Sequence, residues 1–194
     1  IDMKVLYITR KFPPSIGGMQ TQSYFFHKAL SRKSDVLLIS WGSSQLFLPF
    51  FIIYAAIKSI IQLTSRKIDI IQLGDLVLSP LGVLLKLLFN KPVLAVSHGR
   101  DSAYRGLLYN FFIIGSAKKL NKIICVSDYL KQRLRLRGLC NEKLEVIPNG
   151  ISVNEADELS LDREQAISEI EAAYGITLKD KKIILSVSRL VAKK

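Results

Sequence analysis

The sequence predicts an α/β protein with a Rossmann-like, doubly wound parallel sheet. Short apolar runs without charge recur along the chain, and longer segments with helical periodicity separate them. Continuous apolar runs are typical of parallel strands covered on both faces, and their alternation with helices predicts right-handed crossovers. The chain has 194 residues, of which 49% are hydrophobic, and this is enough for a domain-sized core.

The first elements follow from apolar runs and turn residues. We expect strands at 5–8, 36–39, 68–73 and 93–96, and helices at 19–30, 46–63 and 80–89. Pro80 fits the first turn of its helix. The helix after Gly18 is expected to bury one apolar face, made of Phe25, Phe26, Ala29 and Leu30.

The remaining elements continue the alternation. We expect a helix at about 107–120, a strand at 122–126, a helix at 128–137 and a strand at 144–147. Ser127 is a good N-cap for its helix, and Gly138 is a good residue to end it. After residue 150 the chain becomes acidic, and we expect a helix at 168–174 and a strand at 182–187.

This change of character predicts the domain organisation. Residues 1–152 are expected to form the N-terminal domain, and 153–180 a linker with a helix. Residues 181–194 would then open a second domain that this chain contains only in part.

Composition restricts the classes of partner. Lys and Arg exceed Asp and Glu by 28 to 16, and the net charge of +12 favours anionic partners. Cys125 lies in an apolar run and is expected to be a buried thiol, which suits a reducing, cytoplasmic compartment. The apolar segments 46–57 and 76–89 are shorter than the roughly 20 residues that span a bilayer. We expect attachment to a membrane surface at most.

Candidate ligand-binding residues follow several predicted strands, and ligands of doubly wound sheets bind at the carboxyl ends of strands. Gly17 and Gly18 open a helix whose N-terminus attracts anions, although a simple turn explains them equally well. Ser127 is also explained as a helix cap. The other residues at this edge are His98, Arg100, Asp101 and the hinge turn at Asn149 and Gly150.

Five short stretches carry a family resemblance. They are F-P-P at 12–14 with Gly-Gly at 17–18, His-Gly at 98–99, I-C-V-S at 124–127, V-I-P-N-G-I at 146–151 and S-R-L-V-A-K-K at 188–194. In this order the chain resembles the retaining, nucleotide-sugar-dependent glycosyltransferases of family 4, which have the GT-B fold. The resemblance implies two Rossmann-like domains that face each other across a cleft, with this chain as a fragment that contains the acceptor-side N-terminal domain.

The resemblance also implies roles for individual residues. Gly17 and Gly18 would approach the donor, and His98, the catalytic candidate, would lie near the transferred sugar. Arg189 and Lys194 would neutralise the donor diphosphate as the leaving group forms. No metal or other cofactor is implied, and Arg100, Asp101 and Ser127 are the acceptor-side candidates. Ser188 stands where the family usually has glycine, and the family's paired glutamates belong to the missing part, so the fragment alone is expected to be inactive.

The leading hypothesis is a hexosyltransferase-type enzyme. It would transfer a sugar, with retention, from a nucleotide-sugar to a glycan or lipid-linked acceptor in cell envelope polysaccharide or lipopolysaccharide synthesis, at the inner face of the membrane. A nicotinamide-dependent oxidoreductase is disfavoured because no Gly-x-Gly-x-x-Gly follows the first strand.

The alternative is a basic α/β module that binds a membrane surface or another anionic ligand without catalysis. A cluster of positive residues supports it: Lys118, Lys119, Lys122, Lys131, Arg133, Arg135, Arg137 and Lys143. A solvated helix explains the cluster equally well, and binding to anionic lipid would also involve the apolar segment 46–57. No nucleic-acid motif is recognisable, and nucleic acid is not an expected partner.

Overall fold

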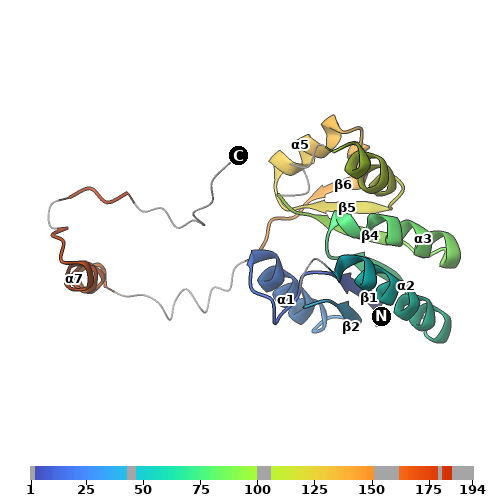
Figure 1. The fold of residues 1–194 in the computed structure, drawn as a ribbon, viewed down its shortest axis with the longest axis horizontal. Helices are drawn as coiled ribbons and strands as arrows, with labels where there is room; N and C mark the ends of the chain where they lie inside the picture. Colours follow the sequence, from blue (N-terminus) through green and yellow to red (C-terminus); the bar gives the residue numbers. More distant parts are fainter. Residues whose placement is uncertain (1–2, 43–46, 100–105, 151–161, 179–180, 185–194) are drawn as a thin grey trace. The chain divides into compact units, whose positions relative to one another are not determined.

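The computed structural model describes residues 3–42, 47–99, 106–150, 162–178 and 181–184. It divides into two units, Ile1–Asn149 and Gly150–Lys194. Unit 1 contains a sheet flanked by helices, whereas the described part of unit 2 contains the helix α7 (Arg163–Tyr174) (Figure 1).

The sheet of unit 1 has six strands, all parallel, in the order β2-β1-β3-β4-β5-β6. This confirms the predicted fold class. The strands are β1 (Lys4–Thr9), β2 (Asp35–Ser40), β3 (Ile70–Leu73), β4 (Val93–Ser97), β5 (Lys122–Cys125) and β6 (Leu144–Val146). The chain goes from β1 to one neighbour, β2, and then returns to the other, β3. The topological switch point, where such sheets bind ligands, therefore lies between β1 and β3.

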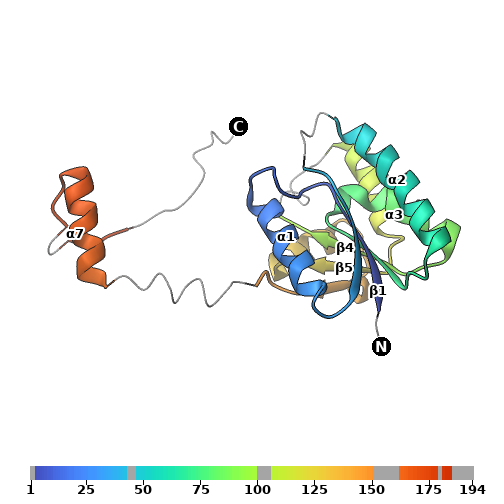
Figure 2. The same cartoon turned by 90° about the horizontal axis from the view of Figure 1, so that it is seen from below.

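The helices connect the strands as predicted, with small shifts at their ends. They are α1 (Gly18–Leu30), α2 (Leu48–Ser65), η2 (Leu76–Leu78), α3 (Ser79–Phe89), η3 (Tyr109–Ile114, π-helical), α4 (Gly115–Ala117), α5 (Asp128–Leu136) and η4 (Asn141–Lys143). Figure 2 shows α1 on one face of the sheet and α2 and α3 on the other. Residues 107–117 form one continuous helical segment that packs against α3.

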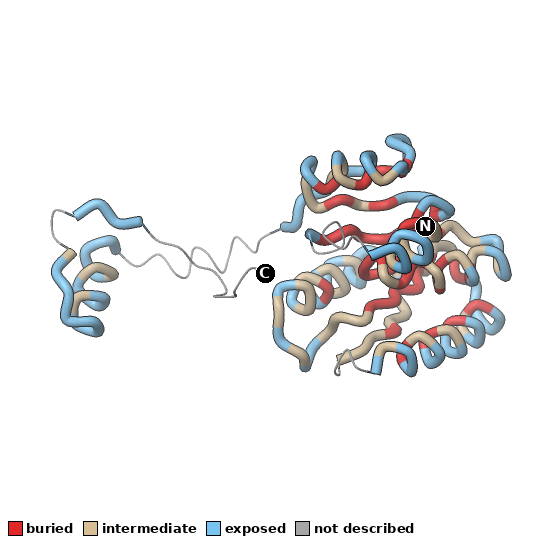
Figure 3. Tube along the Cα trace, turned by 45° about the horizontal axis from the view of Figure 1, so that its top comes forward, coloured by how far each residue is buried: buried red, intermediate tan, exposed pale blue. Residues whose placement is uncertain are grey.

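A hydrophobic core cluster lies between the sheet and the helices α2, α3 and α5. Alternate strand residues such as Leu6, Ile8 and Ile123 point into it, together with Phe51 of α2 and Leu85 of α3. Figure 3 shows the buried segments gathered in the strands and on the sheet-facing turns of the helices. Cys125 is fully buried in this core, as predicted.

The face that α1 buries differs from the prediction. Phe25 and Ala29 are exposed, and Ser23 is buried instead. The stripe that faces the sheet is Ser23, Phe26, His27 and Leu30, which has regular helical spacing. Contacts with Tyr7 of β1 orient the helix in this way. The Tyr7 ring lies 5.3 Å from the ring of Phe26 and is stacked on the ring of His27 at 6.5 Å.

The second unit also corrects the prediction. Its helix begins at Arg163 rather than at residue 168. It ends at Tyr174, as predicted, and its C-cap Gly175 is left-handed with φ 64°. Residues 182–184 are not in a strand, and the rest of the predicted strand lies outside the described residues. A strand is stabilised by hydrogen bonds to a neighbouring strand. The described residues of unit 2 contain no strand that could pair with residues 182–184.

The helix α2 is long and apolar enough to cross a membrane by length and composition, with 18 residues and a mean hydropathy of 1.5. No other described helix meets this criterion. One face of α2 belongs to the core, because Phe51, Ala55, Ser59 and Leu63 recur every four residues and are buried.

Candidate functional site

Three strands end at a cluster of buried polar side chains at the switch point. Thr9 ends β1 and Arg10 follows it, Asp75 lies just after β3, and His98 directly follows β4. Thr9, Asp75 and His98 are buried, and the Arg10 side chain is 10% exposed. We call these four residues the strand-end cluster. Of these four residues, only His98 was predicted as a site residue from the sequence.

Arg10 and Asp75 form a buried ion pair, with Nε of Arg10 2.7 Å from Oδ2 of Asp75. The other carboxylate oxygen, Oδ1, accepts a hydrogen bond of 3.0 Å from the backbone N–H of Val77 and so caps η2. Burial raises the pKa of Asp75, and the Arg10 guanidinium opposes this rise. The pair ties the loop after β1 to the loop after β3, because either charge alone would be costly to bury.

His98 is fixed by a hydrogen bond to the loop after β3. Its Nε2 lies 3.1 Å from the carbonyl oxygen of Gly74. A carbonyl only accepts, so we assign the proton to Nε2, which donates. Burial lowers the pKa of His98, and the ring is therefore neutral near pH 7. In this tautomer Nδ1 carries no proton and is a hydrogen-bond acceptor.

Gly74 allows β1 and β3 to approach closely at this point. A Cβ at this position would lie 2.5 Å from Oγ1 of Thr9. Oγ1 of Thr9 also lies 3.4 Å from the Ser23 hydroxyl and accepts a hydrogen bond from the backbone N–H of Lys11. Thr9 thus connects the strand end, the following loop and α1.

The glycine loop lies at the start of α1, after the same strand end. Gly17 is the N-cap residue with φ +156°, a value that favours glycine, and a Cβ there would lie 2.7 Å from Oε1 of Gln20. Gly18 is the first residue of α1, and a Cβ there would meet nothing within 4 Å. No side chain caps this helix, and no acidic residue occupies its first turn. These features leave the N-terminus suited to an anion.

The other predicted site residues have different positions. Ser127 caps α5, since its hydroxyl accepts a hydrogen bond of 3.4 Å from the backbone N–H of Leu130. It follows β5, the neighbour of β4, and so shares the carboxyl edge with His98. Asn149 and Gly150 are exposed at the boundary of the two units. Four candidates lie outside the described residues: Arg100, Asp101, Arg189 and Lys194.

The basic cluster is spread over two parts of unit 1. Lys118, Lys119 and Lys122 precede or begin β5, at the opposite edge of the sheet from His98. Lys143 of η4 lies beside them, because its Nζ donates a hydrogen bond of 2.7 Å to the backbone carbonyl of Lys118. The others lie on or just after α5: Lys131, Arg133, Arg135 and Arg137. They therefore do not form a single surface on one helix.

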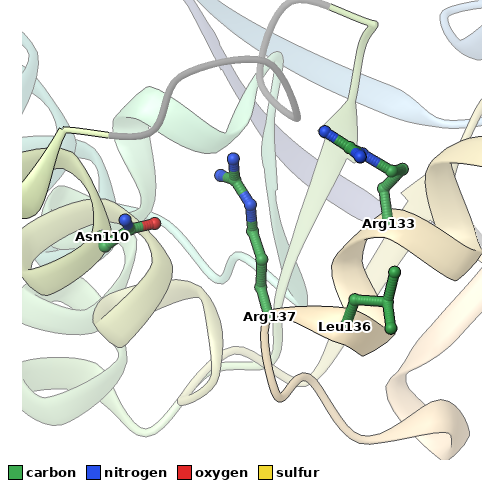
Figure 4. Close-up of a pocket in the computed structure, with 4 residues that line it drawn as sticks. All are labelled: Asn110, Arg133, Leu136 and Arg137. Carbon is green, nitrogen blue, oxygen red and sulfur yellow. The ribbon is translucent and has the colours of Figure 1, made fainter.

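A hollow of about 330 Å³ lies between residues 107–117 and α5. Arg133, Leu136 and Arg137 line it together with Asn110, and both guanidinium groups point toward it (Figure 4). The Arg133 guanidinium also lies 5.9 Å from the centre of the Tyr129 ring, and this contact orients it.

Metal-ligating side chains do not gather in the part of the chain that the structure describes. There, no group of three or more His, Cys, Asp or Glu residues could hold a metal ion.

Comparison with known proteins gives one family and a set of structures. The model of the family described as Glycosyltransferase Family 4 matches residues 16–155, which is more than half of the chain. No curated protein sequence matches.

The similar structures share the fold of this chain at low sequence identity. HepE of Anabaena in complex with UDP has a TM-score of 0.58 at 14% identity, and the match covers 89% of this chain and 50% of HepE. HepE in complex with UDP-glucose has a TM-score of 0.58 at 15% identity, and the match covers the same shares of the two chains. The apo form of the lipopolysaccharide outer core galactosyltransferase WaaB has a TM-score of 0.57 at 14% identity. This match covers 78% of this chain and 47% of WaaB. The chain thus spans about half the length of these proteins, and the likeness confirms the Rossmann-like fold of a GT-B half.

Proposed function

Because this chain belongs to glycosyltransferase family 4, we propose that it forms the acceptor-side half of a retaining enzyme. This enzyme transfers a sugar, of the hexose type, from a nucleotide-sugar donor to a glycan or lipid-linked acceptor. The second, donor-binding half would lie largely outside residues 1–194.

The strand-end cluster is the observation that carries this proposal. It occupies the switch point between β1 and β3, where open α/β sheets bind ligands. Nδ1 of neutral His98 accepts a hydrogen bond from a hydroxyl of the donor sugar, while Nε2 holds the ring against Gly74. The Arg10–Asp75 pair fixes the two loops on either side of the donor.

The glycine loop is the proposed contact for the donor diphosphate. The solved structures of HepE are in complex with UDP and UDP-glucose, which supports a uridine nucleotide-sugar as the first donor to test. Gly17 and Gly18 let the diphosphate approach the backbone, and Arg189 and Lys194 complete its neutralisation when the second half closes. These cationic groups take the place of a metal ion in the proposed reaction.

The acceptor is proposed to bind on the other side of His98, against Arg100, Asp101 and Ser127. The name of WaaB supports a cell envelope saccharide, and the net charge of +12 suits an acceptor that carries phosphate or carboxylate groups. The proposed location is the cytoplasm, at the inner face of the membrane.

The test uses the product of the whole gene, incubated with a panel of nucleotide-sugars and assayed for release of the nucleoside diphosphate. We expect turnover with one donor class and a loss of about a hundredfold in kcat for His98→Ala. His27→Ala, which changes the histidine of α1, is the matched control and should keep its activity. The proposal fails if no nucleotide-sugar is consumed, and salt-sensitive ligand binding without turnover would instead favour the non-catalytic basic module.

Residues 1–194 alone provide a second test. Without most of the donor-binding half, they should bind nucleotide-sugars weakly in calorimetry and transfer no sugar. Tight binding by these residues alone would contradict the division of the site between two halves.

A further inference from the structure

Three neighbouring helical segments expose large apolar side chains on the face of the sheet that α1 does not cover. Ile53, Ile57 and Ile61 of α2, Leu87 of α3, and Leu107 and Phe111 of the following helical segment are 55% to 87% exposed. The segments pack side by side, α2 against α3 and α3 against residues 107–117. Contiguous apolar patches of this kind mark interaction sites. We call this surface the outer helical face.

The apolar residues of α2 form two separate stripes. Phe51, Ala55 and Leu63 point into the core and satisfy the packing of the domain. Ile53, Ile57 and Ile61 lie on another side of the helix, where packing within unit 1 does not require apolar residues. A helix that is apolar all round, but packed on one side only, presents its remaining side to a second apolar environment.

The charges on this side of the domain have a single sign. Among residues 47–99 and 106–119, the acidic residues are Asp69 and Asp75. Asp69 accepts a hydrogen bond from the backbone N–H of Lys4, and Asp75 is buried in the strand-end cluster. The outer helical face therefore contains no carboxylate, and its charged residues are all cations, such as Lys58 of α2.

The cations gather along one border of this face. Each of its three helical segments runs toward the amino edge of the sheet, and basic residues follow each one: Arg66 and Lys67, Lys91, and Lys118 and Lys119. Nζ of Lys86 donates to the backbone carbonyl of Lys119 at 2.9 Å, so neighbouring members of this border lie close together. An apolar surface with a basic border is the pattern that binds the interface of an anionic bilayer.

We propose that the outer helical face docks on the surface of a bilayer that contains anionic lipid. The apolar side chains enter the boundary between headgroups and acyl chains, and the basic border contacts lipid phosphates. A second copy of the chain is a poorer occupant, because pairing this face with itself would bring cations together in a molecule of net charge +12. This inference goes beyond sugar transfer and does not depend on it.

The experiment is flotation of the 194-residue chain with vesicles of phosphatidylcholine and phosphatidylglycerol in equal parts. Vesicles of phosphatidylcholine alone serve as the comparison. The test variant is Ile53→Gln with Ile57→Gln. The matched control is Tyr24→Gln with Phe25→Gln, which changes two exposed apolar residues of α1 on the other face of the sheet. Circular dichroism and the fluorescence of the single Trp41 confirm that each variant is folded.

We expect binding to the anionic vesicles to fall at least about tenfold for the isoleucine variant, because the loss of buried apolar surface weakens insertion. The α1 control should bind like the original chain, and Lys67→Gln with Lys119→Gln should weaken binding mainly at low salt.

Three outcomes would overturn the proposal. The first is anionic-vesicle binding that the isoleucine changes leave unaltered, and the second is binding lost only with Arg133→Gln and Arg135→Gln of α5. The third is a dimer in sedimentation velocity that the isoleucine variant dissociates, which would assign the outer helical face to a second copy of the chain.

Discussion

Nε of Arg10 lies 2.7 Å from Oδ2 of Asp75 at the carboxyl ends of β1 and β3. The two residues come from distant parts of the chain and are almost completely withdrawn from solvent. Because water does not solvate these buried charges, each charge is stabilised by the other. The pair also connects the two loops that flank the switch point.

Breaking this pair should destabilise unit 1 strongly. Arg10→Met leaves the Asp75 carboxylate buried without its partner, and the free energy of unfolding should fall by about 3–5 kcal/mol. Urea unfolding followed through Trp41, which packs 5.5 Å from the Phe51 ring, measures this loss. The control is Asp35→Asn, which breaks the half-exposed pair of Lys4 and Asp35 at 3.6 Å and should cost less than about 1 kcal/mol. Equal losses for the two variants would contradict a buried-pair role.

The strands and most helices were predictable because each carries its own pattern of apolar residues. The strand-end cluster was not, although His98 was selected. Neither Arg10 nor Asp75 was a site candidate, because in the sequence each is a single charged residue beside an apolar run. The sequence does contain one signal for the pair. Arg10 and Asp75 each follow an apolar run that was predicted to be a strand, and this position corresponds to the carboxyl edge of the sheet. Their opposite charges become meaningful only when the order of strands places β1 beside β3.

The orientation of α1 shows a second limit of sequence reasoning. Phe25 and Phe26 are equally apolar, and local periodicity does not decide which of them faces the sheet. The decision comes from the strand beneath, where Tyr7 packs its ring against Phe26 and Thr9 approaches Ser23. A pattern of apolar residues does not predict that Ser23, a polar residue, is buried.

Gly74→Ala should disturb the site through packing. The new Cβ would lie 2.5 Å from Oγ1 of Thr9 and 3.2 Å from its Cα, so the backbones of β1 and β3 must separate. We expect a loss of about 1–3 kcal/mol in the free energy of unfolding. Gly18→Ala is the control, because its Cβ meets nothing within 4 Å, and its stability should stay within about 1 kcal/mol of the original. Urea unfolding of the two variants side by side decides the point, and an unaffected Gly74→Ala protein would refute the close approach.

The two cysteines should react at very different rates with a thiol reagent such as dithionitrobenzoate. Cys125 is fully buried, and burial raises the pKa of its thiol to about 11, so it contains little of the reactive thiolate at pH 8. Cys140 is exposed. Absorbance should record one fast thiol per folded chain and two after denaturation, and Cys140→Ser should remove the fast one. Two fast thiols in the folded chain would contradict the burial of Cys125.

The neutral state of His98 predicts a loss of stability as the pH falls. Burial lowers its pKa in the folded chain below the ordinary value of 6.5, so the unfolded chain binds the proton first. The free energy of unfolding therefore rises with pH between the folded and unfolded pKa values, and His98 costs no stability above about pH 7. Its contribution to the slope within this window is at most about 1.4 kcal/mol per pH unit.

Unfolding experiments from pH 8 to pH 5 on the original chain and on His98→Gln isolate this contribution. Glutamine keeps a donor for the Gly74 carbonyl but does not titrate, so the stability difference between the two proteins should change below about pH 6.5, in favour of the variant. A stability difference that stays constant with pH would mean that His98 binds its proton equally well in the folded and unfolded chains. That result would contradict the lowering of the His98 pKa by burial.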